Sequence, residues 1–380
     1  MREQVVFLSY INFSDPTAGA ARMRMYSKML QSMSVENFLY SIYDFYAIHA
    51  CVNKLNSSRY LRFISYPARL CLYVLSLNKF IKSDCKVVFY LYPTKQVLLD
   101  YLLIIYLKFI KRQRVFLEVN EVRRYGQGVK LKSIRYFKYV LHERLAKYFD
   151  GLVCISKNIE DYYKRYNKNI LRVPILSDDN AYQSNCNYKA DRPFNIGFTG
   201  SIHLQKENLA IFFEALQHIS NNGFTIRFNL YGRISDPKVF YRIVNYYSLA
   251  KIVVYHGVVK QDLLPEVMAK QDLLVLPRAE NKQNRFGFST KLSEYLVSGV
   301  PVLLTDVSDN LVYLTHGENC LVADFNNPES FAKQVEALII NYISIAPTLA
   351  KNAFEVTEEK FNYRIHADGY SKFLASGGEK

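Results

Sequence analysis

The chain alternates short apolar segments with longer amphipathic ones along its 380 residues, and this alternation restricts the folds that it can adopt. Segments such as VVFLSY (5–10) and LLVLP (273–277) are rich in residues that favour buried strands. Strands that alternate with helices predict parallel sheets covered by helices, so we expect an α/β fold. The expected strands are residues 5–10, 38–43, 87–92, 115–120, 151–156, 195–200, 226–232, 252–257, 273–277 and 301–305. The expected helices are residues 20–34, 57–82, 94–112, 131–149, 157–166, 206–220, 236–249, 262–269, 289–298, 328–342 and 355–374.

A polar stretch near the middle of the chain predicts a boundary between two domains. The apolar segment ILRVPIL (170–176) is followed by SDDNAYQSNCNYKADRP (177–193), which is polar and shows no periodicity. A chain of this length also exceeds what a single core normally organises. We expect one domain at 1–176, a second at 177–354 and a last helical segment at 355–380.

The excess of positive over negative charge lies entirely in the first half of the chain. Residues 1–190 carry 30 Lys and Arg against 14 Asp and Glu, whereas residues 191–380 carry 19 against 20. Residues 45–83 contain cations among Tyr, Phe and Leu but no acidic residue. This mixture suits an anionic membrane surface, near which each cation contributes about 1 kcal/mol, and a solvated helix face is the alternative. Nucleic acid is not expected as a partner, because no nucleic-acid-binding signature occurs. The candidate membrane contacts in this segment are Arg59, Arg62 and Arg69.

A glycine-containing loop, a short helix and a buried strand are predicted for residues 286–306 (FGFSTKLSEYLVSGVPVLLTD). Gly287 permits close approach of the backbone to a ligand, and Ser289 or Thr290 is expected to cap the helix. Lys291 stands in the first helical turn, where a cation opposes the helix dipole unless an anion is bound there. We therefore expect a phosphate at this helix N-terminus and a ribose hydroxyl near Glu294, one turn further on.

Two more cations follow expected strands of the second half. Lys206 comes after strand 195–200, and Arg278 directly follows LLVLP. Ligands of open α/β sheets bind at the carboxyl ends of the strands. With Lys291 these residues predict a cationic pocket for a diphosphate, whereas an exposed lysine at a helix start is the alternative for Lys206.

The same segments carry a resemblance to a known family. Residues 287–303 (GFSTKLSEYLVSGVPVL) resemble the donor-site signature of family 4 of the retaining glycosyltransferases, which have the GT-B fold. The branch that builds bacterial capsule, exopolysaccharide and O-antigen chains is the most similar. Further segments that resemble the family, in the expected order, are residues 19–30, 116–124, 149–163, 198–216 and 272–278.

The resemblance implies two Rossmann-like domains with doubly wound parallel sheets that face each other across a cleft. It implies a retaining transfer from a UDP- or GDP-sugar, without a metal ion or other cofactor, onto a polyprenyl-diphosphate-linked glycan. It also implies a cytoplasmic protein at the inner face of the bacterial cytoplasmic membrane. In the family an Arg–Lys pair stabilises the departing nucleotide, and here Lys206, Arg278 and Lys291 are the candidates. The implied donor-site residues are Gly19, Gly200, Ser201, Gly287, Phe288, Ser289, Thr290 and Glu294.

Two positions depart from the family pattern. Ser201 stands where many members have arginine, and Phe286 replaces the first glutamate of the E-x7-E motif. The donor sugar is therefore open, and Glu280 is only a weak substitute candidate. Arg285 lies in the same loop and is equally consistent with a ligand contact or a solvated cation.

In the first half, residues with a functional interpretation also follow strands. Arg22 is expected either to face an acceptor or to solvate its helix. Asn120 and Glu121 end strand 115–120, where a carboxylate orients or activates an acceptor hydroxyl, and a plain strand-end turn is the alternative. Arg123 is expected to meet an acceptor phosphate or solvent, and Ser156 resembles a family serine near the cleft.

Other classes of protein are disfavoured by missing patterns. The six cysteines show no CxxC pairing, which favours reduced thiols, and the seven histidines show no HExxH or HxH spacing. No signal peptide is visible, and the apolar stretch 96–110 is interrupted by Asp100 and Lys108 and is too short to span a bilayer. Two alternatives remain: a sugar-nucleotide epimerase, or a non-catalytic partner subunit of a glycosyltransferase complex.

Overall fold

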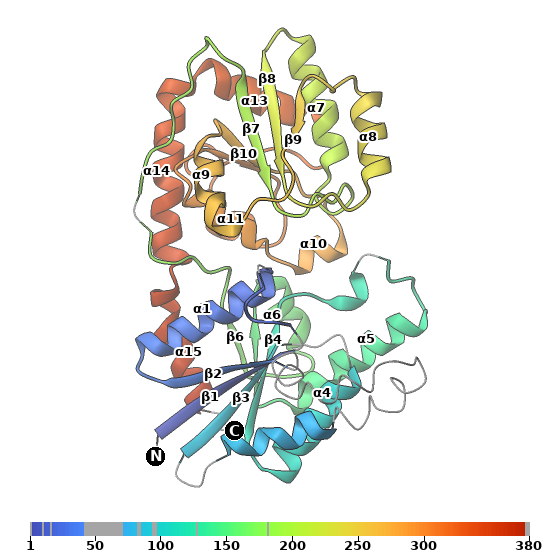
Figure 1. Ribbon diagram of the computed structural model, residues 1–380, viewed down its shortest axis with the longest axis vertical. Helices are drawn as coiled ribbons and strands as arrows, with labels where there is room; N and C mark the ends of the chain where they lie inside the picture. Colours follow the sequence, from blue (N-terminus) through green and yellow to red (C-terminus); the bar gives the residue numbers. More distant parts are fainter. Residues whose placement is uncertain are drawn as a thin grey trace. The chain divides into compact units, whose positions relative to one another are not determined.

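Two parallel six-stranded sheets organise the chain, one in each of two compact units (Figure 1). The computed structural model describes residues 2–376 except positions 10, 16, 42–70, 82–84, 93–96, 127 and 181. The first unit comprises Met1–Pro174 and Tyr363–Lys380, and the second comprises Ile175–Asn362. The predicted boundary 176/177 lies two residues from the first of these positions, and 354/355 lies eight residues from the second.

The sheet of the first unit has the strand order β2-β1-β3-β4-β5-β6. Its central strands are buried along their length, as the apolar runs predict for a sheet covered on both faces. The strands are β1 Arg2–Ser9, β2 Glu36–Ser41, β3 Cys85–Leu91, β4 Arg114–Val119, β5 Gly151–Cys154 and β6 Ile170–Arg172. The described helices include α1 Ala18–Ser32, α4 Val97–Ile104, a π-helix Ile105–Ile110, α5 Ile134–Leu145, α6 Lys157–Tyr163 and α15 Tyr363–Ser376.

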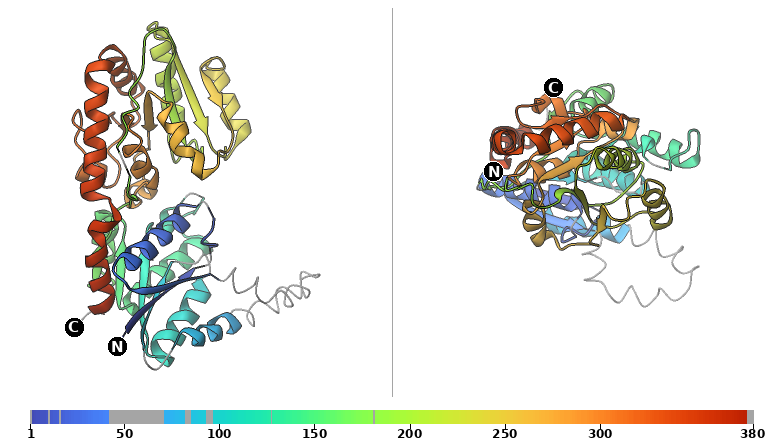
Figure 2. Two further views of the ribbon diagram at one scale, coloured as in Figure 1. Left: turned by 60° about the vertical axis from the view of Figure 1, so that its left-hand side comes forward. Right: turned by 90° about the horizontal axis from the view of Figure 1, so that it is seen from above.

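The sheet of the second unit has the order β12-β11-β10-β7-β8-β9, with helices on both faces (Figures 1 and 2). Its core is rich in phenylalanine, and Phe212 packs edge-to-face against Phe228 and Phe331. The strands are β7 Phe194–Thr199, β8 Ile226–Tyr231, β9 Val253–Tyr255, β10 Leu273–Leu276, β11 Val302–Leu304 and β12 Leu321–Val322. The helices are α7 Leu209–Asn221, α8 Pro237–Tyr246, α9 Leu264–Ala269, α10 Lys282–Phe286, α11 Thr290–Leu296, α12 Asn310–Tyr313, α13 Pro328–Ile340 and α14 Tyr342–Lys360.

Each sheet contains one point where the chain reverses its direction of travel across the strands. In the first sheet β2 and β3 lie on opposite sides of β1, and in the second sheet β8 and β10 lie on opposite sides of β7. Helices that leave such a pair of strands diverge to the two faces, so a crevice opens at the carboxyl ends. The topology therefore marks the ends of β1 and β3, and of β7 and β10, as the places for ligand sites.

The end of the chain belongs to both units. We expected one helix over 355–374, but the structure has α14 ending at Lys360 in the second unit and α15 beginning at Tyr363 in the first. α15 packs along α1, where the buried ring of Tyr370 stacks on Tyr26 with 4.7 Å between centroids. The break is a tertiary effect, because each helix buries its apolar side chains against a different core.

Most expected elements are present, with different ends. The structure adds β6, β12, α10 and α12, which are two to five residues long and carry too little periodicity to be predicted. α7 begins at Leu209 rather than at Lys206, because Asn208 has a left-handed backbone, with φ of 53°. The expected helix 57–82 lies mostly outside the described residues, and the expected helix 94–112 divides into α4 and the π-helix.

The described cysteines are unpaired with one another, and the described helices do not span a membrane. The sulfur atoms of Cys71, Cys154, Cys186 and Cys320 form no disulfide. Within the described part of the chain, every helix is too short or too polar to cross a bilayer.

Candidate functional site

The site begins with close packing between the end of β7 and the start of α11. Gly200, directly after β7, has a φ of +97°, a conformation that side chains with a Cβ rarely adopt. A Cβ at this position would lie 2.7 Å from Cε of Lys291, so only glycine leaves room for the lysine. Nζ of Lys291 lies 4.1 Å from the centroid of the Phe198 ring, within range of a cation–π contact.

A buried glutamate joins two of the predicted cations, Arg278 after a strand and Lys291 at the start of a helix. Oε1 of Glu207 lies 3.2 Å from Nζ of Lys291, and Oε2 lies 3.2 Å from Nε of Arg278. The side chains of Glu207, Arg278 and Lys291 are 3%, 8% and 15% exposed. Because β7 and β10 are neighbours, this cation cluster (Glu207, Arg278 and Lys291) stands at the topological switch point of the second sheet.

The cation cluster carries one positive charge more than it can neutralise. Burial alone would raise the pKa of Glu207, but Lys291 and Arg278 outweigh it and lower that pKa to about 2. Burial lowers the pKa of Lys291 to about 8, which Glu207 only partly offsets and to which Arg278 adds. Two cations share one carboxylate, and this excess charge suits a bound anion.

Neighbouring side chains hold the loops of the cluster in place. Nδ2 of Asn284, on α10, donates to the carbonyls of Lys206 at 2.9 Å and Ala279 at 2.8 Å. Oγ1 of Thr305 donates to the carbonyl of Arg278 at 2.7 Å, and the amide of Thr199 donates to the Tyr295 hydroxyl at 2.8 Å. The backbone around the cluster is therefore tied to β7, α10 and the end of β11.

The expected short helix and buried strand are present as α11 and β11, but the loop before them differs from the prediction at Phe288. Gly287 has a φ of −96° and space for a Cβ, so nothing within the protein requires glycine there. Phe288 is buried, and its ring stacks on Tyr313 and meets Phe361 edge-on, so this side chain packs in the core rather than facing a ligand.

The start of α11 is also not capped as predicted. Ser289 occupies the N-cap position but its side chain makes no capping hydrogen bond, and Thr290 is the first residue of the helix. The anion that we expected beside Lys291 is supplied by Glu207 of the protein itself.

Glu294, predicted to bind a ribose hydroxyl, lies one helical turn after Lys291 on α11. Its carboxylate is half-buried, and burial raises its pKa although Lys291 acts in the opposite direction. Within the described residues no hydrogen-bond donor reaches this carboxylate, so both oxygens remain available to the hydroxyls of a ligand.

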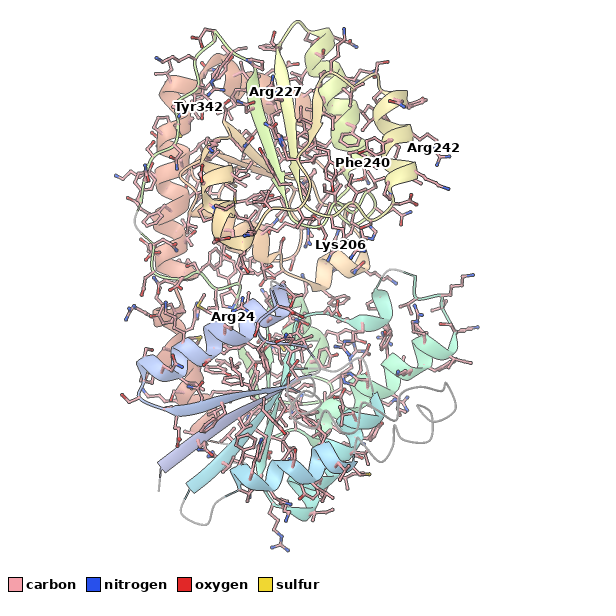
Figure 3. All side chains as sticks on the ribbon, in the orientation of Figure 1. Arg24, Lys206, Arg227, Phe240, Arg242 and Tyr342 are labelled. Carbon is pink, nitrogen blue, oxygen red and sulfur yellow. The ribbon has the colours of Figure 1, made fainter. Side chains whose placement is uncertain are left out.

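The remaining residues predicted for the second unit lie nearby, outside the cation cluster. Lys206 adjoins Glu207 and lies near the carboxyl ends of β7 and β8, whereas Arg227, near the start of β8, lies at the opposite edge (Figure 3). Ser201 and Arg285 are exposed. Lys206 thus adds positive charge beside the cation cluster and helps to lower the pKa of Glu207.

In the first unit, Gly19 and Asn120 meet at the switch point of their own sheet. A Cβ on Gly19 would lie 2.4 Å from the hydroxyl of Tyr92, which follows β3. The same hydroxyl accepts a hydrogen bond of 2.7 Å from Nδ2 of Asn120, which follows β4. Gly19, predicted for the donor site, and Asn120, predicted to face the acceptor, therefore lie beside the same hydroxyl of Tyr92.

Glu121 and Arg123 form a pair of their own. Oε1 of Glu121 lies 3.7 Å from Nε of Arg123, and the glutamate side chain is 48% exposed. Ser156 caps α6 by accepting from the amide of Ile159, so its role is structural in part.

Arg22 does not fit an acceptor or membrane contact. The side chain is buried, and Nε lies 2.5 Å from Oε1 of Glu118. Its other nitrogens donate to the carbonyls of Val173 at 2.7 Å and Pro174 at 2.6 Å. The guanidinium joins α1 to β4 and to the segment after β6, which corrects the prediction.

Two further predictions concern the basic segment of the first unit and the absence of a metal ion. Arg59, Arg62 and Arg69 lie outside the described residues. In the ranges that are described, no three His, Cys, Asp or Glu side chains are placed together as metal ligands.

Sequence reasoning missed three residues of these sites. Glu207 adjoins Lys206 in the sequence, but its pairing with Arg278 and Lys291 spans 71 and 84 positions, which no local pattern reveals. Asn284 lies between the expected strand 273–277 and the expected helix 289–298, where no pattern predicts a structure. Tyr92 ends a predicted strand, and that position was the one available signal for it.

Comparison with known proteins finds a family model that matches part of the second unit and solved structures that share the fold of the chain. Residues 193–341 match the model of the family described as glycosyl transferases group 1. No match to this chain is found among curated proteins.

Among solved structures, HepE from Anabaena in complex with UDP-glucose aligns with a TM-score of 0.70 and 12% identity, over 98% of this chain and 99% of its own. Sucrose-phosphate synthase from Thermosynechococcus elongatus aligns with a TM-score of 0.69 and 14% identity, over 99% of each chain. The lipopolysaccharide outer core galactosyltransferase WaaB aligns with a TM-score of 0.67 and 10% identity, over 98% of this chain and 99% of its own. The predicted GT-B fold is confirmed.

Proposed function

We propose that this chain is a glycosyltransferase that takes a UDP-sugar as donor. The observation that carries the proposal is the cation cluster, which holds an excess positive charge at the switch point of a domain that matches a glycosyltransferase model. The base is proposed as uracil because the structural neighbour HepE is known in complexes with UDP and UDP-glucose. Glu294 is proposed to bind the ribose.

The proposed chemistry is stabilisation of a leaving group. As the bond between the sugar carbon and the diphosphate oxygen breaks, the diphosphate takes the electron pair and gains negative charge. Arg278 and Lys291, fixed and largely shielded from water, stabilise that charge more strongly than the same groups would in solution. Glu207 holds the two cations in position before the donor arrives. We propose that these cations supply the charge that a divalent metal supplies elsewhere.

The acceptor and the stereochemistry are proposed from the sequence resemblance. We propose transfer with retention onto a lipid-linked glycan during synthesis of a bacterial surface polysaccharide, with the enzyme at an anionic membrane surface. The similarity in fold to WaaB, a lipopolysaccharide galactosyltransferase, is consistent with this class of acceptor. The cation-rich segment 45–83, with Arg59, Arg62 and Arg69, supports a membrane location.

Calorimetric titration with UDP, GDP and their sugars, in the presence of EDTA, tests the donor site. Wild type should bind UDP, and Lys291→Met should weaken binding by about 10- to 100-fold because one charged contact is lost. Lys333→Met on α13 removes an exposed lysine elsewhere in the second unit and serves as control; its affinity should equal that of wild type.

Turnover decides between an enzyme and a binding subunit. Phe286 in place of a glutamate and the exposed Ser201 are the features that favour a non-catalytic subunit. An assay of UDP release from a UDP-sugar should show turnover. NMR of the anomeric proton of the product should then show transfer with retention. Tight UDP binding without release of UDP from any donor would refute the enzyme and leave the binding subunit, and no binding of any nucleotide would refute both.

A further inference from the structure

Helix α5 of the first unit is attached to its neighbours through polar side chains. Nε2 of His142 lies 2.8 Å from Oδ2 of Asp100 on α4, and both side chains are buried. Glu143, also buried, accepts a hydrogen bond of 2.6 Å from the Tyr162 hydroxyl and pairs with Arg124 at 3.4 Å. These contacts orient α5 on the unit, with α4 beside it (Figure 1).

Three large apolar side chains of the same helix are exposed instead, whereas Leu145 at its end is buried. Ile134 is 90% exposed, Phe137 is 59% exposed and Leu141 is 48% exposed, while Leu131 just before the helix is 73% exposed. Residues spaced by three and four positions lie on one face of a helix, so Ile134, Phe137 and Leu141 form one apolar stripe. A helix that only packed on its own unit would turn these side chains inward.

The stripe continues onto the neighbouring π-helix. Phe109 and Ile110 are 57% and 62% exposed, and the Phe109 ring lies 6.2 Å from that of Tyr148, just after α5. Scattered exposed apolar residues are common on any protein, but a contiguous set marks a contact surface. We call the exposed apolar residues 109, 110, 131, 134, 137, 141 and 148 the α5 surface.

The surroundings of the α5 surface are positively charged. Between residues 128 and 148 the only acidic residue is Glu143, which is buried and paired. The cations in this range are all exposed: Lys130, Lys132, Arg135, Lys138, Arg144 and Lys147. Exposed apolar side chains on a helix that also carries many cations are typical of helices that lie in the interface of an anionic bilayer.

We propose that the α5 surface is the membrane-docking face of the protein, with its apolar side chains in the bilayer interface and its cations on anionic headgroups. This inference rests on the proposed membrane location of the enzyme. It names the residues of the described structure that would contact the bilayer. It is separate from segment 45–83, which was selected by its cations among Tyr, Phe and Leu.

A second copy of the chain fits this surface less well than a lipid. A symmetric contact would bring the cations of one copy against the same cations of the other copy. Like charges across an interface oppose association. An anionic headgroup layer neutralises all of the cations and also accepts apolar side chains of any shape. Charge complementarity therefore favours the membrane.

Co-sedimentation of the full chain with vesicles tests the proposal. Wild type should bind vesicles of phosphatidylcholine with phosphatidylglycerol and bind pure phosphatidylcholine weakly. Ile134→Ser/Phe137→Ser should reduce vesicle binding by about tenfold or more, because two apolar side chains no longer insert into the bilayer interface. Ile340→Ser/Ile343→Ser is the matched control, since Ile340 and Ile343 are 70% and 86% exposed in the second unit, and it should bind like wild type.

Two further readouts separate the possible failures. UDP affinity of the α5 variant should remain at the wild-type value, so loss of nucleotide binding would concern the donor site or folding and not the surface. Equal vesicle binding by wild type and the α5 variant, or binding that ignores phosphatidylglycerol, would overturn the proposal. So would concentration-dependent dimerisation of wild type in analytical ultracentrifugation that the α5 variant abolishes.

Discussion

Each unit contains a buried cluster of charges near the switch point of its sheet, and the two clusters differ in balance. In the first unit, Arg22 is matched by Glu118 and by two backbone carbonyls, and Glu118 also accepts from the Tyr90 hydroxyl. In the second unit, Arg278 and Lys291 share the single carboxylate of Glu207. The first cluster is neutral and the second carries a positive charge.

The pKa shifts of the two clusters follow from this difference. Burial alone would lower the pKa of Arg22, but Glu118 more than compensates and raises it. The pKa of Lys291 is instead lowered to about 8, because burial and Arg278 oppose its charge. A cluster whose charges and donors are matched stabilises the fold, whereas one with an excess cation is ready for an anion.

Removal of the arginine from the neutral cluster should have the largest effect on stability. Arg22→Ala leaves the Glu118 carboxylate buried without its cation and should cost about 3–5 kcal/mol of unfolding free energy. Urea denaturation of the full chain measures this loss. Arg24→Ala on the same helix is the control, because Arg24 is half-buried and bonds only loop carbonyls, and it should cost about 1 kcal/mol (Figure 3). Equal costs for both variants would contradict the comparison.

Removal of the carboxylate from the charged cluster should also lower the stability of the folded protein, and bound UDP should restore part of that stability. Glu207→Gln leaves two buried cations unpaired and should cost about 3 kcal/mol at neutral pH. UDP should then raise the unfolding midpoint of this variant by more than it raises that of wild type, since the diphosphate replaces the missing anion.

Acid unfolding gives a second test of the same carboxylate. Because folding lowers the pKa of Glu207 from 4.5 to about 2, its stabilisation is present above pH 4.5 and is lost as the pH falls from 4.5 towards 2. Wild type should therefore lose more stability than Glu207→Gln over this range. Parallel acid profiles for the two proteins would show that Glu207 is not the group responsible.

The affinity for UDP should depend on pH through Lys291. Below about pH 8 the ammonium is charged and binds the diphosphate, and above it the dissociation constant should rise by about tenfold per pH unit. Calorimetry between pH 6.5 and 9.5 measures this slope. A tenfold change in the dissociation constant corresponds to about 1.4 kcal/mol of binding free energy. Lys291→Met should bind weakly with a flat profile, and a flat profile for wild type would assign the charge to another residue.

The smallest effect is expected at the glycine that makes room for Lys291. Gly200→Ala places a Cβ at a φ of +97° and 2.7 Å from Cε of Lys291. It should cost about 1–2 kcal/mol of stability and weaken UDP binding a few-fold as the lysine shifts. Gly223→Ala is the control, because its φ of +89° carries the same strain with no atom within 4 Å of the added Cβ. UDP affinity should fall only in the first variant.

The sequence predicted the sheets well because strand and helix patterns are local. Runs such as LLVLP and VVFYLY are apolar over their full length, and both became buried strands at the centres of their sheets. The same local logic placed Arg278 and Lys206 after strands. It failed for Arg22, since a basic residue on a helix has the same pattern whether it is solvated or buried against a distant glutamate.

The sequence by itself determined the α/β class, the division into two domains and the placement of cations at strand ends, because these depend on the periodicity and order of neighbouring residues. Only the tertiary structure decided which charges are matched. Glu207 reaches Arg278 and Lys291, and Glu118 reaches Arg22, across 71 to 96 positions of the chain. Charge balance depends on distances between side chains from different elements, and packing fixes those distances.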